Sequence, residues 1–396
     1  MKWVSAVSER PSLEAAVAEV AVSAQIRLGE LKPDLVMVFV SEHHAEHWDH
    51  LPDAIAAAMD CPVVLGCTSG GVIGGGHEVE QRPAIALVAA HLPGVALKPF
   101  HLDTQEVPNP LVAPGFWSRR LGLTAEEAPR FLLLPDPMTC HVQMLLEGLD
   151  RAFPGAVKLG GLASGAQGTG RHGLLLNGSS FRRGVVGVAM TGNVIVDALV
   201  AQGCRPIGLP MFVTACHRNI LLELDGRPVL SVIRELHQGL GPRDQQLFRS
   251  SLFLGVVMRE DEQVYHHGDF LIRNLLGVDE DTQGLRVGTL LRPNQVVQFH
   301  LRDAQTSSED LSLLLARYRE GLPEGVAPCG GVMFSCLGRG MHLYGEPDHD
   351  MTILREELGE LAIGGFFGNG EVGPVQGATF LHGYTSVMGL FRPLDV

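Results

Sequence analysis

A pattern of strand, helix, strand, glycine-rich segment and hairpin occurs twice in the first half of the chain and again near its C-terminus. In the first copy, the apolar strand that begins at Asp34 precedes the glycine-rich segment at Gly66 by 32 residues. In the second copy, Phe131 and Gly160 are 29 residues apart. A recurring unit of this length predicts a fold that uses one supersecondary unit several times.

The copies are recognised by their hydrophobic patterns. Short continuous apolar runs predict buried strands, and apolar residues at spacings of three and four predict helices. The first copy has strands 34–41, 61–65, 84–90 and 95–100 and helix 47–59; the second has strands 130–135, 157–159, 185–190 and 194–201 and helix 139–153; the third has strands 331–336, 362–367, 378–382 and 386–391 and helix 351–361. An alanine-rich helix at 13–28 precedes the first copy.

This order predicts an α/β, two-domain protein of repeated strand-helix-strand-loop-hairpin modules, with mixed β-sheets flanked by helices. The region between the second and third copies has a different order of elements, and the turn signal Asp225-Gly226 marks its start. We expect an N-terminal helical lead-in at 1–29, a domain of two related modules at 30–225, a second domain at 226–380, and a C-terminal strand and tail at 381–396.

Glycine supplies 48 of the 396 residues, and many of these glycines lie in the corresponding segments of the three copies. Backbone N–H groups of such segments can line a pocket or hold an anion. Glycine also permits tight turns and close packing between repeats, and the sequence leaves both interpretations open. The candidate residues of these segments are Gly66, Thr68, Ser69, Gly160, Gly161 and Ser164.

Charge and composition exclude several classes of protein. With 44 acidic and 30 basic residues the net charge is −14, so we expect no nucleic-acid binding. No run of about 20 apolar residues is present, and the first residues lack the apolar stretch of a signal peptide, so we expect no membrane association. The seven cysteines are widely spaced and form no C-x-x-C, which predicts reduced thiols in a cytoplasmic protein.

Several segments resemble the two FIST domains, and the resemblance covers roughly residues 30 to 380. The C-x-x-R-G sequence at 336–340 and the aromatic–glycine–glutamate segment at 365–371 resemble the C-terminal FIST domain. Segments 268–273 and 301–304 fit the same domain, whereas 66–71, 160–161 and 202–208 resemble the N-terminal FIST domain.

The resemblance implies a small-ligand-binding sensory protein for signal transduction. Amino acids are proposed ligands of the family, and some members are described as haem-containing nitric oxide sensors. FIST domains often occur fused or adjacent to histidine kinases. This chain has no room for a fused transducer, so we expect a separate signalling protein, such as a histidine kinase, as its partner.

Arg339 and Glu371 are the strongest ligand-binding candidates. An arginine fork matches a carboxylate, and a glutamate can accept hydrogen bonds from an ammonium group, so the pair suits an amino-acid-like ligand. The alternative is a structural ion pair between two loops. Cys336 either faces the same pocket or is a small buried hydrophobic residue. Gly340, Phe366 and Phe367 complete this set of candidates.

Two alternatives to amino-acid sensing remain at the level of sequence. Any one of 17 histidines could ligate a haem, although no C-x-x-C-H attachment motif is present and the cofactor is otherwise unknown. An enzyme acting on a small molecule could use the thiol of Cys336 or a metal at His43 and His47, which fit the pattern H-x-x-E-H. A solvated start of a helix is the alternative that we favour for these histidines.

No catalytic motif identifies the chain as an enzyme. The sequence lacks G-x-S-x-G, the P-loop and the kinase motifs. Residues 368–373 match G-x-G-x-x-G, but Pro374 and a predicted strand follow where a dinucleotide site needs a helix. We therefore expect binding rather than catalysis.

Overall fold

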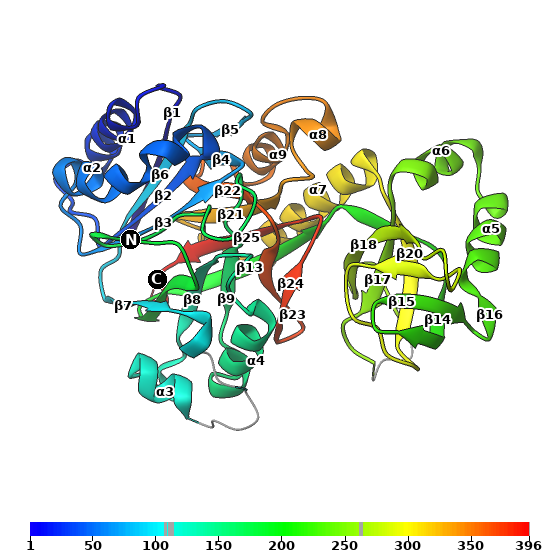
Figure 1. The fold of residues 1–396 in the computed structure, drawn as a ribbon. Helices are drawn as coiled ribbons and strands as arrows, with labels where there is room; N and C mark the ends of the chain where they lie inside the picture. Colours follow the sequence, from blue (N-terminus) through cyan, green and yellow to red (C-terminus); the bar gives the residue numbers. More distant parts are fainter. Residues whose placement is uncertain (107–108, 110–114, 261–263, 396) are drawn as a thin grey trace. The chain divides into compact units, whose positions relative to one another are not determined.

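The computed structural model describes residues 1–396 except 107–108, 110–114, 261–263 and 396 (Figure 1). The chain forms two compact units. Unit 1 comprises Met1–Ala201, Leu311–Leu381 and Thr385–Val396, and unit 2 comprises Gln202–Asp310 and His382–Tyr384. Along the sequence, unit 2 is thus inserted into unit 1.

Three modules with the same order of strands make up unit 1, apart from residues 202, 304–310 and 382 of the third module, which fall in unit 2. In every module a strand and a helix precede a parallel pair of strands, and a hairpin and a return strand follow that pair. Module 1 consists of β1 (Lys2–Ser8), α1 (Leu13–Leu28), β2 (Leu35–Ser41), η1 (Glu42–His50), α2 (Leu51–Ala58), β3 (Val63–Ser69), β4 (Gly71–Gly74), β5 (His77–Glu80) and β6 (Ile85–His91).

The other modules repeat this order. Module 2 consists of β7 (Val95–Leu102), α3 (Phe116–Leu121), β8 (Arg130–Pro135), α4 (Val142–Ala152), β9 (Lys158–Gly161), β10 (Leu174–Leu176), β11 (Ser179–Phe181) and β12 (Val185–Gly192). Module 3 consists of β13 (Ile195–Gln202), α7 (Ala304–Gly321), β21 (Gly330–Cys336), α8 (Met341–Tyr344), α9 (His349–Leu358), β22 (Ile363–Gly368), β23 (Glu371–Val375), β24 (Ala378–His382) and β25 (Thr385–Arg392).

The three six-stranded sheets of unit 1 are completed by an exchange of hairpins. Their orders are β1-β6-β2-β3-β10-β11 for sheet 1, β7-β12-β8-β9-β23-β24 for sheet 2, and β13-β25-β21-β22-β4-β5 for sheet 3. The last two strands of each sheet therefore come from another module. The exchange forms a closed cycle: module 1 completes sheet 3, module 3 completes sheet 2, and module 2 completes sheet 1.

The sheets pack against one another through apolar side chains. The ring of Phe39 on β2 lies 5.0 Å from that of Phe366 on β22 and 6.4 Å from that of Phe334 on β21, measured between centroids. A Cβ at Gly161 on β9 would meet Phe366 and Phe334, so the backbone of module 2 approaches the same cluster. Helices cover the opposite faces: α1 and α2 pack on sheet 1, α3 and α4 on sheet 2, and α7 and α9 on sheet 3 (Figure 1).

The described part of unit 2 forms a closed barrel to which helices are added. Its strands are β14 (Cys204–His217), β15 (Ile220–Leu224), β16 (Arg227–Pro228), β17 (Leu252–Val257), β18 (Phe270–Val278), β19 (Leu285–Val287) and β20 (Val296–Arg302), and its helices are α5 (Val229–Gly239) and α6 (Pro242–Ser250). The order β14-β20-β17-β18-β19-β15 closes through pairing of β14 with β15.

The predicted fold class is confirmed, because the chain is an α/β protein of repeated modules with mixed sheets flanked by helices. The strands expected to close each copy as a hairpin, such as 185–190 with 194–201, instead lie in different sheets, and in the first two copies the hairpins are formed by shorter strands that precede them. Helix α1 has the predicted bounds. The domain boundaries inferred from the sequence stay predictions. Among the residues that the structure describes, none of the helices combines the length and apolar character that a membrane crossing needs.

Three glycines occupy matching positions in the modules and explain part of the glycine excess. Gly66, Gly160 and Gly365 stand opposite Val38, Leu133 and Met333 in the parallel pairs of the three modules. At each glycine a Cβ would lie no more than 2.5 Å from the carbonyl oxygen of that partner. The parallel pair of every module thus needs a residue without a side chain.

Replacing Gly160 or Gly365 with alanine should lower the free energy of unfolding by about 1–3 kcal/mol, because strand backbone must shift to admit the Cβ. Gly321→Ala, at the end of α7, is the control: nothing lies within 4 Å of its Cβ position. This change should be neutral or stabilising by up to about 1 kcal/mol. Urea unfolding of the variants measures the difference, and equal effects at the three sites would contradict the explanation.

Candidate functional site

The three matching glycines provide an internal alignment of the modules. In module 3 the glycine Gly365 pairs with Met333, and Ser335 lies two residues after Met333 on the same strand. Ser335 pairs in turn with Ser386 on β25. The matching pairs are Val40 with Ile85 in module 1 and Pro135 with Val185 in module 2. Module 3 thus carries two hydroxyl groups where the same architecture elsewhere carries only apolar side chains.

Both hydroxyl groups are buried on the helix-covered face of sheet 3. Side chains alternate along a strand, so Ser335 shares a face with Met333, which packs in one cluster with Met351 of α9. Ser335 and Ser386 are each 0% exposed, and within the described part of the chain neither Oγ has a hydrogen-bond partner. A buried hydroxyl without a partner is costly, so these groups call for an explanation beyond the fold.

Two glutamates lie on β5, in the hairpin of module 1 that completes sheet 3 beside Ser335 and Ser386. In sheet 3, Gly365 pairs with Ile73, which pairs with Glu78, and Gly71 pairs with Glu80. The carboxylate of Glu78 accepts a hydrogen bond from the backbone N–H of Met351 at 2.8 Å through Oε1. Its Oε2 has no partner among the described residues. Burial, reinforced by the charge of Asp350, raises the pKa of Glu78 well above its ordinary value.

Glu80 fixes the loop that follows β21. Its Oε1 accepts a hydrogen bond from the backbone N–H of Met341 at 2.9 Å. Gly340, with φ of +59°, lies so close that a Cβ there would collide with this carboxylate. Gly340 therefore serves the close approach of loop and hairpin, and burial raises the pKa of Glu80.

Arg339 lies in this loop and is bound inside the protein. Its Nε donates to Oδ2 of Asp350 at 2.9 Å and its Nη2 to Oδ1 at 3.1 Å, and both side chains are at most 2% exposed. Although burial disfavours the charged carboxylate, the guanidinium and a hydrogen bond with His349 hold the pKa of Asp350 at about 2. The pair is thus a fully ionised, buried salt bridge.

Two rings enclose the ion pair. The guanidinium carbon of Arg339 lies 5.6 Å from the ring centroid of Tyr344, within cation–π range. The Tyr344 ring stacks on that of His349 with centroids 3.4 Å apart, and His349 Nδ1 lies 3.1 Å from Asp350 Oδ1. Helix α8, the loop after it and the start of α9 thus form a cover over one end of sheet 3.

Glu371, the first residue of β23, is completely buried. Its Oε2 accepts hydrogen bonds from Thr385 Oγ1 at 2.8 Å and from the Thr385 backbone N–H at 3.4 Å, and its Oε1 has no partner in the described structure. Burial raises the pKa of Glu371 to about 8, against the opposing effects of Thr385 and of the Arg339 charge. The charge of Arg339 therefore reaches this carboxyl group, while the arginine fork itself binds Asp350.

The remaining candidates near Arg339 lie on different faces of the sheet. Cys336, the last residue of β21, is half-buried, and its Sγ accepts from the Gly338 N–H at 3.5 Å. Phe366 belongs to the aromatic cluster between the sheets, whereas Phe367 packs towards α7 and α9. Phe367 pairs with Ser335 and thus lies beside the two buried serines, Ser335 and Ser386.

The glycine-rich segments predicted as loops are largely strand, which corrects that expectation. Gly66, Thr68 and Ser69 belong to β3, and Gly160 and Gly161 belong to β9. These glycines are explained by the strands: at Gly66 and Gly160 the neighbouring strand lies so close that a side chain would not fit.

The hydroxyl groups of these segments bind protein backbone. Thr68 Oγ1 accepts from the Gly173 N–H at 3.0 Å, and Ser69 Oγ donates to the Val40 carbonyl at 3.2 Å. Ser164 Oγ accepts from the Gly70 N–H at 2.9 Å and donates to the Phe367 carbonyl. Residues of three modules are thereby joined, and the observed contacts are those of packing between repeats.

The histidine-rich segment and the dinucleotide-like segment have other surroundings. His43 and His47 are on η1, a 3-10 helix after β2, and His44 between them is buried. Within the ranges that the structure describes, no group of three or more His, Cys, Asp or Glu side chains is placed to hold a metal ion. Residues 368–373 continue from β22 into β23, so a strand follows where a dinucleotide site would need a helix.

Sequence reasoning missed most of the polar residues around Arg339. Those residues are Glu78, Glu80, Ser335, Tyr344, His349, Asp350 and Ser386. Ser335 could have indicated this polar site from the sequence, because it is a polar residue within an otherwise apolar strand and the corresponding strands of modules 1 and 2 have Val40 and Pro135 at its position. Only the hairpin exchange brings Glu78 and Glu80 to this sheet.

Family models match nearly the whole of the chain. The FIST N domain matches residues 34–227, and the FIST C domain matches residues 230–374. The chain belongs to the FIST family, whose domains are associated with small-ligand sensing and signalling.

Similar full-length proteins occur in mycobacteria. An uncharacterized protein of Mycobacterium tuberculosis (strain H37Rv) is 37% identical over 385 residues, which cover 97% of this chain and 98% of the relative. An uncharacterized protein of Mycobacterium bovis is 34% identical over 385 residues, with 97% of each chain covered. The similarity therefore extends over both units.

The raised pKa of Glu371 predicts a pH-dependent stability. Between its ordinary value of 4.5 and about 8, the folded chain binds a proton at this site that the unfolded chain releases. The free energy of unfolding should therefore fall as pH rises through this window, by at most about 1.4 kcal/mol per pH unit. Because Glu78 and Glu80 also have raised pKa values, Glu371→Gln should reduce the slope of the profile measured by urea unfolding without abolishing it, while Glu356→Gln on the exposed face of α9 should leave the slope unchanged. A profile unchanged in Glu371→Gln would refute the assignment.

The unpartnered serines predict an unusual response to truncation. Ser335→Ala and Ser386→Ala each remove a buried hydroxyl without a partner, so each should raise the free energy of unfolding by about 1 kcal/mol. Ser164→Ala is the matched control, because its equally buried hydroxyl makes two hydrogen bonds. Its loss should cost about 1–3 kcal/mol. Chemical denaturation distinguishes these cases, and destabilisation of all three variants alike would show that the serines have partners.

Proposed function

We propose that this protein is a small-ligand-binding sensory protein, and that its ligand binds at the polar end of sheet 3. One observation carries the proposal: modules 1 and 2 build the same sheet with apolar residues where module 3 has Ser335 and Ser386. The polar groups are therefore not required by the architecture. Retention of costly polar groups in a buried place is typical of a binding site.

The chemistry of the site suits an amino-acid-like metabolite. Oε2 of Glu78 and Oε1 of Glu371 are buried acceptors without partners in the described chain, and an ammonium group supplies donors. The fork of Arg339 binds a carboxylate in the two-point geometry that an amino acid offers. In the structure the side chain of Asp350 occupies that fork.

Displacement of Asp350 would connect binding to a signal. Asp350 lies in the first turn of α9, and Met351 beside it is fixed by Glu78. A ligand carboxylate that takes over Arg339 would free the start of this helix and shift the population between two arrangements of the cover. We infer that a separate cytoplasmic signalling protein, such as a histidine kinase, reads this change.

A thermal-shift screen of the full chain with amino acids, nucleotides and haem tests the proposal. We expect an amino acid to raise the melting temperature of the wild type, and Arg339→Ala to abolish that rise, because the carboxylate loses its two donors. Arg319→Ala, which removes a half-exposed arginine paired with Glu357, is the matched control and should respond like the wild type.

The outcomes separate the candidate functions. A normal ligand response in Arg339→Ala would show that the proposed anchor is wrong. Loss of the buried arginine also leaves Asp350 unpaired and destabilises the fold, so Ser335→Val with Ser386→Val serves as a second test that introduces no buried charge. A Soret band after incubation with haem would favour the haem sensor, and no response to any compound would refute small-ligand sensing.

A further inference from the structure

The place in module 2 that corresponds to the polar site is a pocket of about 310 Å³ that is open to solvent. It lies where the chain leaves β8 and enters α4, and Leu162 and Leu381 form part of its wall. Leu162 stands two residues beyond Gly160, as Phe367 stands two residues beyond Gly365. Leu381 is on β24, the outer strand of the exchanged hairpin, which corresponds to β5 in sheet 3.

In module 1 the corresponding place is filled by a side chain of the protein. Trp48, in the segment after β2, is 0% exposed, and its Nε1 donates to Ser180 Oγ at 2.8 Å. Ser180 is on β11, the outer strand of the hairpin that completes sheet 1. A Cβ at Gly173 would overlap the indole ring, so the backbone there is shaped around it.

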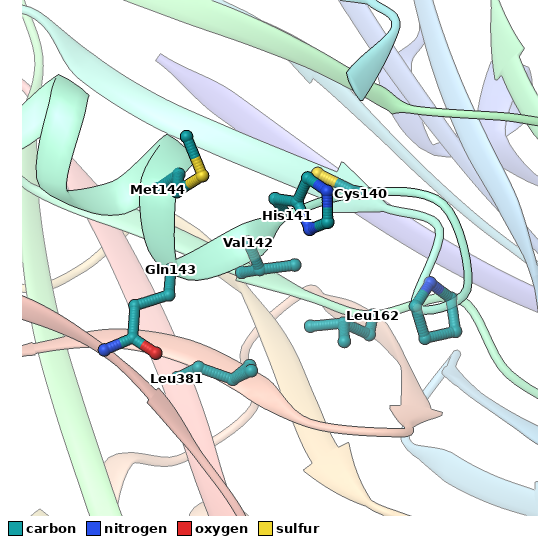
Figure 2. Close-up of a pocket in the computed structure, with 8 residues that line it drawn as sticks. Cys140, His141, Val142, Gln143, Met144, Leu162 and Leu381 are labelled. Carbon is teal, nitrogen blue, oxygen red and sulfur yellow. The ribbon is translucent and has the colours of Figure 1, made fainter. Parts of the chain in front are cut away.

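Module 2 has the space without the tryptophan. Figure 2 shows Val142, Leu162 and Leu381 converging on one space, with Gln143 at its edge. Cys140 and Met144 add sulfur atoms, which make favourable contacts with aromatic rings. The pocket has a volume of about 310 Å³ and is open on one side, so a bicyclic ring has room to lie against its apolar wall with one edge in solvent.

We propose that this cavity is a second ligand site, which binds a small planar aromatic compound of about the size of indole. The ring would take the place that Trp48 takes in module 1, and the exposed side-chain amide of Gln143 would accept a ring N–H as Ser180 does there. This inference is independent of the amino-acid site in module 3, since the two sites share no residue.

Titration of the isotope-labelled full chain with indole, followed by NMR, tests this proposal. Amide shifts should change saturably and should be confined to residues near the cavity, chiefly 140–144, 162 and 381. Leu381→Trp should weaken indole binding at least about tenfold, because the new ring occupies the space. Gln143→Trp blocks the same cavity from an exposed position and keeps the test valid if Leu381→Trp does not fold.

A control variant fills a different cavity of similar size. Ala56→Leu narrows the cavity of about 270 Å³ between α2 and the turn at Asn177, and it should leave the indole response unchanged. Shifts that are absent, spread over the surface without saturation, or equally strong in Leu381→Trp and Gln143→Trp would overturn the proposal. The amino-acid response of module 3 should be intact in both blocking variants.

Discussion

The fold of unit 1 depends on backbone hydrogen bonds that each module makes with a hairpin of another module. The second parallel strand of every module would be an open edge by itself, and an open edge invites uncontrolled pairing. β10, β23 and β4 close the edges of β3, β9 and β22 in a cycle. Because the cycle closes, no sheet of unit 1 is complete until all three modules are present.

This closed arrangement frees the modules to differ at one place. The place at the end of each parallel pair is filled by Trp48 in module 1, open and apolar in module 2, and polar in module 3. The buried ion pair of Arg339 and Asp350 must overcome the desolvation of two charges, which apolar residues of similar volume would avoid. The comparison within one chain thus separates residues that the scaffold needs from residues that we propose serve a ligand.

Local patterns predicted most of the elements of unit 1. The bounds of α1 and many strands of the repeats follow from the spacing of apolar residues. The glycine excess predicted loops, whereas Gly66, Gly160 and Gly365 lie in strands, where the close parallel pairs require a residue without a side chain. The hairpin exchange could not be predicted, because β4 and β5 lie in the glycine-rich stretch after 61–65, where no strand was predicted, and no local pattern there indicates which sheet edge they join. Asp350 was missed for a similar reason: in sequence it is one acidic residue in a helix, and only the fold brings it to Arg339.

The insertion of unit 2 has a consequence for dividing this protein into pieces. The two family matches meet between residues 227 and 230, whereas the barrel runs from β14 through β20 across that point. A cut there would part β14 and β15 from the strands with which they close the barrel, and would also remove β4 and β5 from sheet 3. The ranges that the family models match and the compact units of the structure therefore have different boundaries in this chain.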